Sequence, residues 1–263
     1  MAEKKKSWNV SAEIRAEQKA ALANMTRKEK FKYYWEYYRY HVIISIIVIA
    51  SLSHIIYGIV TNRDFSFYAV IINSHGLDGE ALSEEFSVLA DLDNEKLHCF
   101  IDTTLFINTN EFSQTDSMLV QRLFATVGTG ELDTIVADAF TFIHFANAEF
   151  FIDLRLVLSD DEIEYYKDIF FYVDRAAIEA RRTNFNIDIV HEIKTPEQMK
   201  QDVELRRQPE IMTEPVPVGI FLSDSLILKD AYWGDTVPVI GITVSSSRKD
   251  KVLELIEFLG SRD

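Results

Sequence analysis

Short polar segments follow each of the β-like runs in the C-terminal part of the chain. Their side chains can donate or accept hydrogen bonds, as a site for a polar ligand requires. In an open parallel sheet, ligands bind outside the carboxyl ends of the strands. The sequence therefore predicts a ligand-binding site at these positions, although the same residue types also cap helices and form turns. The predicted site comprises Asn73, Ser74, His75, Asp102, Thr103, Thr104, Asp138, Ser223, Asp224, Ser245 and Ser246.

Catalytic patterns are absent from the sequence. It has no Gly-x-Ser-x-Gly elbow, no glycine-rich phosphate loop ending in Lys-Ser or Lys-Thr, and no His-Glu-x-x-His pair. The six histidines are scattered without the spacing of metal ligands. We therefore expect a non-enzymatic protein that uses no cofactor. A hydrolase is a further hypothesis, which a pocket with two convergent carboxylates at catalytic separation would support.

Two other features have a simpler structural interpretation. Asp91, Asp93 and Glu95 alternate as in a calcium loop but lack its glycine turn and its distant bidentate acid. We expect a solvated helix end there and no metal site. Cys99 is the single cysteine, so it forms no disulfide within the chain, and its apolar run favours a small buried side chain over a reactive thiol.

Hydrophobic periodicity indicates which elements must position the predicted site. Amphipathic helices are expected at Leu77–Leu89, at Met118–Val127 with Gly128 and Gly130 ending it, after Ser159 as N-cap, and at Val252–Leu259. The β-like runs are Phe65–Asn73, Leu97–Thr103, Asp133–Asp138, Phe170–Val173, Val216–Leu222 and Val237–Val244.

The order of these elements predicts an α/β fold. The first three strands alternate with helices, and such units form right-handed crossovers between parallel strands. We therefore predict a mostly parallel sheet with flanking helices over residues 62–263. Residues 175–215 are polar with few apolar periodicities, so they are expected to form a less regular excursion.

A membrane span is predicted before this α/β domain. No Asp, Glu, Lys or Arg occurs between Tyr40 and Asn62. The apolar run Val42–Val60 would form a helix about 28 Å long at 1.5 Å per residue, close to the thickness of a bilayer core. A buried helix of a soluble domain is the alternative, but such a helix is rarely apolar on every face. Aromatic residues that favour the membrane interface precede the run: Tyr33, Tyr34, Trp35, Tyr37, Tyr38 and Tyr40.

The span is expected to belong to one long helix at residues 26–61. Thr26 and Glu29 have the spacing of a capping box at its start. About 40 residues precede the apolar run and no small-x-small pair closes it, so we expect an uncleaved anchor. His54 lies within the span, where a proton-linked role and a neutral histidine near an interface are both open.

The charge distribution predicts the orientation of the chain. Residues 1–40 contain ten Lys and Arg against five acidic residues, a formal charge of +5, which leaves −20 for the rest of a chain whose total is −15. The positive-inside bias places the arm at residues 1–25 in the cytoplasm and residues 62–263 outside the cell membrane. The acidic total also argues against nucleic acid as a partner, because a phosphate backbone is bound by basic surfaces.

Several segments resemble the extracytoplasmic solute-binding proteins of bacterial ATP-driven importers. Gly130–Asp138 (GELDTIVAD) is similar to their Gly-Glu-x-Asp entry into a core strand with an acid at its end. Pro217–Asp224 (PVGIFLSD) and Val239–Leu259 (VIGITVSSSRKDKVLELIEFL) are similar to their late strands and returning helix. The segment Thr26–Tyr38 (TRKEKFKYYWEYY) also resembles single-span proteins of Gram-positive bacteria.

The resemblance implies a solute-binding lobe, with two departures. That family has two lobes and a lipoprotein cysteine, whereas the chain beyond residue 61 has the length of one main lobe and follows a span. The leading hypothesis is a membrane-anchored extracytoplasmic module that binds a small ligand or a protein partner without catalysis. The alternative is a structural or scaffolding protein of the cell envelope, or a subunit of a membrane complex.

Overall fold

The computed structural model describes residues 16–17, 19–20, 23, 25–61, 64–92, 97–183, 193–233 and 236–260. The chain forms two compact units, Met1–Asn62 and Arg63–Asp263.

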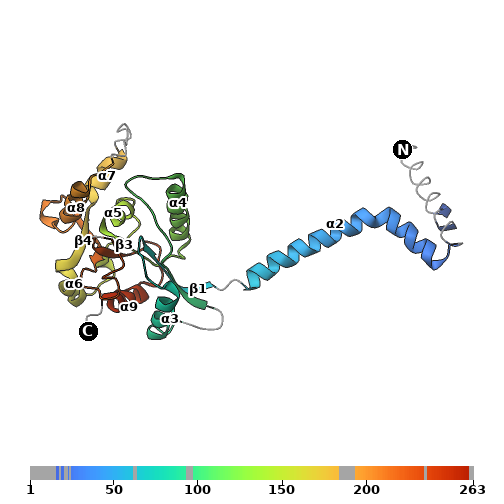
Figure 1. The fold of residues 1–263 in the computed structure, drawn as a ribbon, viewed down its shortest axis with the longest axis horizontal. Helices are drawn as coiled ribbons and strands as arrows, with labels where there is room; N and C mark the ends of the chain where they lie inside the picture. The colour runs from blue at the N-terminus through green and yellow to red at the C-terminus, as the bar shows by residue number, and fades with distance from the viewer. Residues whose placement is uncertain are drawn as a thin grey trace, which may run out of the picture. The chain divides into compact units, whose positions relative to one another are not determined.

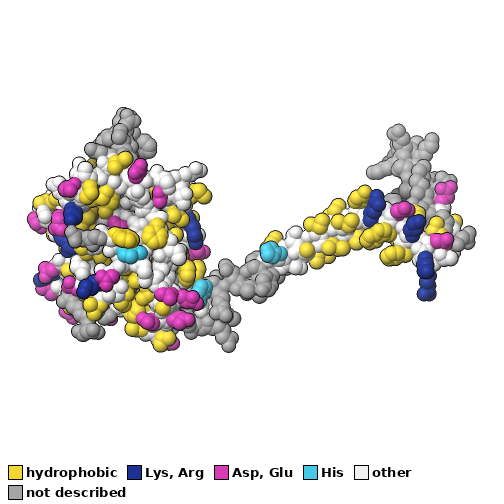
Figure 2. All heavy atoms as spheres, in the orientation of Figure 1, with side chains coloured by type: hydrophobic (Ala, Val, Ile, Leu, Met, Phe, Trp, Pro, Cys, Tyr) yellow, Lys and Arg dark blue, Asp and Glu magenta, His cyan; other side chains and the backbone are white. Residues whose placement is uncertain are grey.

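The first unit contains the long helix α2 (Arg27–Thr61), which confirms the helix predicted at residues 26–61. Its start is the predicted capping box, in which the Thr26 backbone N–H donates to Glu29 Oε2 over 2.8 Å. By length and composition, the window Tyr38–Ile55 can cross a membrane, with a mean hydropathy of 1.4 and no residue buried. Figure 2 shows this stretch as hydrophobic side chains with basic ones gathered before it.

The predicted interface aromatics lie at the start of this window on α2. Tyr34 and Tyr38 stack with ring centroids 6.1 Å apart, and Phe31 stacks on Trp35 at 6.4 Å. His54 is also exposed. Of the remaining aromatics, Tyr33 is partly exposed, Tyr40 is exposed, and the side chain of Tyr37 lies outside the described residues.

The second unit is built on a six-stranded sheet in the order β2-β1-β3-β6-β5-β4. The three neighbours β2, β1 and β3 are parallel, whereas β3 with β6, β6 with β5, and β5 with β4 are antiparallel. The strands are β1 (Asp64–Ile72), β2 (Leu97–Asp102), β3 (Thr134–Asp138), β4 (Phe170–Asp174), β5 (Pro215–Phe221) and β6 (Pro238–Ile242).

The prediction of a mostly parallel sheet is therefore wrong, because the sheet is mixed. All six predicted strands form, but only the two pairings of β1 are parallel. Parallel neighbours need a crossover, usually a helix, whereas antiparallel neighbours can be joined by a loop. The connection from β5 to β6 contains no helix among its described residues, and these two strands are antiparallel.

Helices cover both faces of the sheet (Figure 1). Side chains from α3 (Gly79–Leu89) and α9 (Lys249–Gly260) enter the core on one face, and those from α4 (Gln114–Thr129) and α5 (Ala139–Asn147) enter it on the other. The remaining helices are α6 (Asp160–Tyr166), α7 (Arg175–Thr183) and α8 (Pro196–Leu205), with 3-10 turns η1 (Leu154–Leu156), η2 (Lys167–Ile169) and η3 (Pro209–Ile211). The excursion at 175–215 is thus more regular than expected, since it contains α7 and α8.

Phe142 of α5 anchors this helix to the sheet. Its ring is fully buried, stacks on Phe151 with centroids 4.3 Å apart, and lies over Gly219 of β5 and Gly241 of β6. A Cβ atom at Gly241 would lie 2.7 Å from both rings, and one at Gly219 would lie 2.8 Å from Phe142. The two glycines therefore make room for the aromatic side chains that hold α5. The N-terminus of α5 lies at the end of β3, where Asp138 is its N-cap.

Candidate functional site

Asn73 and Asp138 meet at the carboxyl edge of the sheet. Asn73 directly follows β1, and Asp138 ends β3, which runs parallel beside it. The Asn73 Nδ2 atom donates to Asp138 Oδ2 over 2.9 Å and also lies 2.9 Å from Thr141 Oγ1. Parallel pairing of β1 and β3 thus places together two of the residues that the sequence predicted for the site.

The Asn73 side chain also holds the loop that follows β2. Its backbone has φ of 61°, a left-handed conformation that asparagine tolerates better than most residues. In this position the side-chain amide makes a pair of hydrogen bonds with the backbone of Ile107, accepting from its N–H at 2.8 Å and donating to its carbonyl at 3.0 Å. Asn73 therefore connects β1, β3 and the loop at 105–110.

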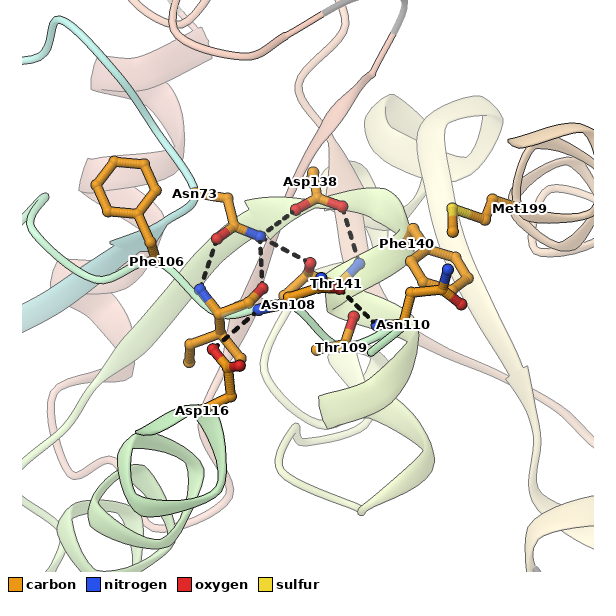
Figure 3. Close-up of a pocket in the computed structure, with 11 residues that line it drawn as sticks. Asn73, Phe106, Asn108, Thr109, Asn110, Asp116, Asp138, Phe140, Thr141 and Met199 are labelled. Atoms are coloured by element: carbon orange, nitrogen blue, oxygen red, sulfur yellow. Dashed lines mark hydrogen bonds between the residues drawn. The ribbon is translucent and has the colours of Figure 1, made fainter. Parts of the chain in front are cut away.

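A cleft of about 420 Å³ opens at this junction (Figure 3). Its polar side comes from the ends of β1 and β3, the loop after β2, and the first turn of α4. Its apolar side comes from Phe106, Phe140 and Met199, the last of these on α8. The full lining is Asn73, Phe106, Ile107, Asn108, Thr109, Asn110, Asp116, Asp138, Phe140, Thr141 and Met199.

The two carboxylates of the cleft are held by helix N-termini. Asp138 is the N-cap of α5, and its Oδ1 accepts from the Thr141 N–H at 2.9 Å. Asp116 lies in the first turn of α4 and accepts from the Ser113 N–H at 2.8 Å. Hydrogen bonds from the Ser113 hydroxyl and N–H lower the pKa of Asp116. Each carboxylate is thus fixed in place while keeping lone pairs for a further donor.

Sequence reasoning missed most of this lining. The predicted residues directly follow strands, whereas Asn108 and Asn110 lie in a loop and Phe140 and Thr141 lie on α5. The signal available was the density of Asn and Thr between residues 103 and 110, whose side chains can bind a polar ligand but are also common in turns. No local sequence pattern predicts that Met199 lines the cleft, because its position there depends on how α8 packs on α5.

Five other predicted residues lie at the same edge but outside the cleft lining. Ser74 is buried, with its hydroxyl 3.4 Å from the Ile71 carbonyl, and His75 stacks on Trp233 with ring centroids 4.4 Å apart. Asp102 is buried and accepts from the Thr104 N–H and hydroxyl, whereas the Thr103 hydroxyl lies near the Leu77 carbonyl. The contacts of Ser74 and Asp102 are local turn contacts, as in the alternative interpretation, whereas His75 and Thr103 contact residues more distant in the sequence.

Ser223 and Asp224 line a second hollow at the end of β5. It has a volume of about 550 Å³ and lies between α6 and α9. Because β5 runs in the same direction as β3, these residues share the carboxyl edge. Acidic side chains surround them, namely Asp161, Glu162 and Glu257, and the hollow is separate from the Asn73–Asp138 cleft.

The expectation that Ser245 and Ser246 join the site is wrong. Strand β6 is antiparallel to β3, so the residues after it lie at the opposite edge of the sheet. There the Ser245 hydroxyl bonds the Val127 carbonyl, and the Ser246 hydroxyl donates to Asp133 Oδ1 at 2.7 Å. Their role is to fix the start of α9, at a distance of one strand length from the cleft.

The remaining sequence features fall outside the cleft. Cys99 is buried on β2, as predicted. Asp91 has φ of 49° after α3, whereas Asp93 and Glu95 lie outside the described residues. Within the described ranges, no group of three His, Cys, Asp or Glu side chains could hold a metal ion.

No family model matches the chain, and no curated protein matches it. The class that the fold defines is an α/β lobe with a mixed six-stranded sheet, accompanied by one helix long and apolar enough to cross a membrane.

Proposed function

We propose that this protein is a membrane-anchored binding module whose α/β lobe takes a small polar ligand in the Asn73–Asp138 cleft. One observation carries the proposal. Two side chains from parallel strands meet by a 2.9 Å hydrogen bond at the carboxyl edge of the sheet, and they line a cleft of about 420 Å³. Ligand sites in open α/β sheets form at such edges, next to the point where strand order reverses.

The strand order supports this location. Strand β1 lies between β2 and β3 in the sheet. The chain crosses from β1 to β2 on one side and then from β2 back past β1 to β3 on the other, so the strand order reverses between β1 and β3. This reversal leaves room at the carboxyl ends, and Asn73 and Asp138 border it. The proposed site is therefore at the switch point of the parallel part of the sheet.

The proposal includes no catalytic step. The lining contains no Cys, His, Ser or Lys side chain, and its ionisable groups are the carboxylates of Asp116 and Asp138. Its two carboxylates accept backbone hydrogen bonds as helix caps, which positions them for binding. The solute-binding resemblance of the Gly130–Asp138 segment supports the same interpretation, since Asp138 is the acid at its end.

We propose further that α2 anchors the lobe with the basic arm in the cytoplasm and the lobe outside. The apolar window Tyr38–Ile55 and the aromatic side chains at its start support the anchor. The excess of Lys and Arg before the window supports the orientation. Protease added to intact cells is expected to trim residues after 62 and to spare the arm; trimming of the arm alone would reverse the orientation.

A ligand screen by thermal shift tests the binding function. The full chain in detergent micelles is screened against polar metabolites, and we expect at least one compound to raise the unfolding midpoint. The same compound should have little effect on Asp138→Asn, which keeps an N-cap for α5 but changes the carboxylate. If no compound raises the midpoint of the native chain, the small-ligand function is wrong and the scaffolding alternative becomes the better one.

A further inference from the structure

Four aromatic side chains form one face at the start of α2. They follow the i, i+3, i+4, i+7 spacing that places residues on one side of a helix: Phe31, Tyr34, Trp35 and Tyr38. Phe31 stacks on Trp35 with ring centroids 6.4 Å apart. Tyr34 stacks on Tyr38 in the same way, at 6.1 Å. These residues are between 42% and 71% exposed, so they form a continuous apolar surface, which we call the aromatic face.

Basic side chains border the aromatic face on both sides. Lys28, Lys32 and Arg39 stand at i, i+4 and i+11, so at about 100° per residue they form a row along the helix beside Trp35. Lys30 lies on the other border of the face. The three residues of the row are exposed, and Lys30 is partly exposed. The face is therefore apolar in the middle and positively charged along its borders.

The two acidic residues of this segment lie on the opposite side of α2. Glu29 and Glu36 are seven residues apart, close to two turns, and stand about 150° or more around the helix from the middle of the aromatic face. The Glu29 carboxylate also accepts from the N–H and the hydroxyl of Thr26, each at 2.8 Å. Among the described residues, no Lys or Arg of α2 forms an ion pair. The positive charge along the face is therefore not compensated within the described part of the chain.

The position of this face on α2 indicates what covers it. It directly precedes the apolar window Tyr38–Ile55 on the same helix. Figure 1 shows α2 as bent, with its blue N-terminal part turned away from the line of the rest. A bend of this kind allows the first turns to lie along a membrane surface while the apolar window crosses the bilayer. Helical segments with aromatic residues on one face and Lys or Arg at its borders bind in the headgroup layer, and anionic lipids attract them.

We propose that residues 27–39 of α2 lie in the headgroup layer and bind anionic phospholipids, with the aromatic face toward the acyl chains and the basic borders at the lipid phosphates. This inference rests on the proposed membrane anchor, to which it adds the class of lipid and the segment that recognises it. Each Lys or Arg near an anionic membrane surface strengthens binding about fivefold. A second copy packed on the same face would instead bring the basic borders of two chains together, with the acidic residues on the far side of each helix.

The fluorescence of Trp35 reports which lipid surrounds this segment. The chain has three tryptophans, so Trp8→Phe and Trp233→Phe leave Trp35 as the single tryptophan. This full chain is reconstituted at low salt into vesicles of phosphatidylcholine with one-tenth phosphatidylglycerol. Bromine, which quenches tryptophan at contact range, is carried by the phosphatidylglycerol in one preparation and by the same amount of phosphatidylcholine in the other. We expect the brominated phosphatidylglycerol to quench Trp35 about threefold or more as effectively as the brominated phosphatidylcholine.

Variants of the basic border then assign the contact. Lys28→Gln combined with Lys32→Gln removes two charges but keeps two good helix formers, and it should bring the ratio of the two quenching efficiencies close to one. Lys28→Arg combined with Lys32→Arg is the matched control, because it keeps both charges, and the ratio should stay as in the native border. High salt should lower the ratio of the native border, since it screens exposed charges.

Flotation of the vesicles after an alkaline wash separates this inference from the proposed anchor. A chain that floats with the vesicles, with a quenching ratio that the Gln variant lowers and the Arg variant keeps, supports the anionic-lipid site. A floating chain whose Trp35 is quenched equally by both lipids overturns the inference and leaves the anchor intact. A floating chain whose Trp35 neither lipid quenches also overturns it, since protein such as a second copy then covers the aromatic face. A chain that the alkaline wash removes contradicts the anchor, and the inference fails with it.

Discussion

Arg248 and Asp133 form a partly buried ion pair, although the two residues lie 115 positions apart in the sequence. The Arg248 Nε atom lies 2.9 Å from each carboxylate oxygen of Asp133, whose side chain is fully buried. Asp133 also accepts from the Tyr68 N–H at 2.9 Å. The guanidinium group further donates to the carbonyls of Phe65 and Glu131 at 3.0 and 2.9 Å.

This ion pair joins the segment before β3 to the segment before α9. Asp133 is the acid of the Gly-Glu-x-Asp motif before β3, and Arg248 belongs to the Ser-Ser-Ser-Arg-Lys run before α9. Together they connect the start of β1, the start of β3 and the returning C-terminal segment at the edge opposite the cleft. Asp133 and Arg248 therefore hold these three parts of the domain together.

Removal of the Arg248 side chain should destabilise the lobe strongly. Arg248→Ala leaves the Asp133 charge buried and unpaired, a change that costs about 3–5 kcal/mol in other proteins. The free energy of unfolding of the full chain, measured by chemical denaturation, checks this value. Arg155→Ala is the matched control, because Arg155 pairs with Asp153 at 2.7 Å but is 49% exposed. A cost below about 1 kcal/mol is expected for that surface pair, and equal costs for the two variants would contradict the account.

A methyl group at Gly241 should be poorly tolerated. The added Cβ would lie 2.7 Å from the Phe142 and Phe151 rings, which are packed against each other. Overpacking of this kind costs about 1–3 kcal/mol. Gly128→Ala in α4 is the matched control. Apart from the neighbouring residues and the backbone of the helix itself, no atom lies within 4 Å of its new methyl group. That variant should gain about 0.5–1 kcal/mol from helix propensity, and a neutral Gly241→Ala would show that α5 is not held in the way described.

Replacement of Asn73 by glycine tests how much the Asn73 side-chain hydrogen bonds contribute to stability, because glycine keeps the backbone conformation. Glycine accepts the positive φ at no cost, but it loses the hydrogen bonds to Ile107, Asp138 and Thr141. We expect a loss of about 2–3 kcal/mol in the free energy of unfolding. Glu149→Gly is the control, since Glu149 also has positive φ, at 60°, and pairs only with exposed Arg182. Its stability should change by less than about 1 kcal/mol, and a similarly small change in Asn73→Gly would contradict the bridging role.

Stability should fall with rising pH in the alkaline range because of Tyr166. Burial and the nearby Glu257 raise the pKa of Tyr166 from 10 to about 12. Between these values the unfolded chain releases a phenol proton that the folded chain keeps, so the contribution of Tyr166 is complete below pH 10 and is lost toward pH 12. Denaturation at several pH values should give a shallower alkaline decline for Tyr166→Phe than for the native chain, and identical declines would refute the assignment.

Local structure was predictable where the sequence carries a local signal. Ser159 is the expected N-cap of α6, and Gly130 ends α4 with a left-handed φ of 75°. The strand at Phe65–Asn73 is found at Asp64–Ile72, one residue earlier. Alternation of polar and apolar residues and the preferences of cap positions act over a few residues, so they can be read without the rest of the fold.

Strand direction was not predictable in the same way. The pattern of β6 is apolar throughout, and it gives no information on whether the strand runs with β3 or against it. The direction of β6 depends on how the chain returns from β5. Because β6 runs against β3, Ser245 and Ser246 lie far from Asp138. The cleft loop at 106–110 was missed for a related reason, since its place depends on the left-handed turn at Asn73.

The side-chain amides of the cleft give the most direct test of the central claim that this edge binds a ligand. Asn73, Asn108 and Asn110 line the cleft, whereas Asn147 at the end of α5 does not. In the full chain labelled with 15N-asparagine in detergent micelles, a compound that raises the unfolding midpoint in the thermal-shift screen should shift the side-chain amide resonances of the three cleft residues in a saturable manner and leave Asn147 unchanged. Saturable shifts confined to Asn147, or unchanged cleft resonances with a compound that calorimetry shows to bind, would contradict the account.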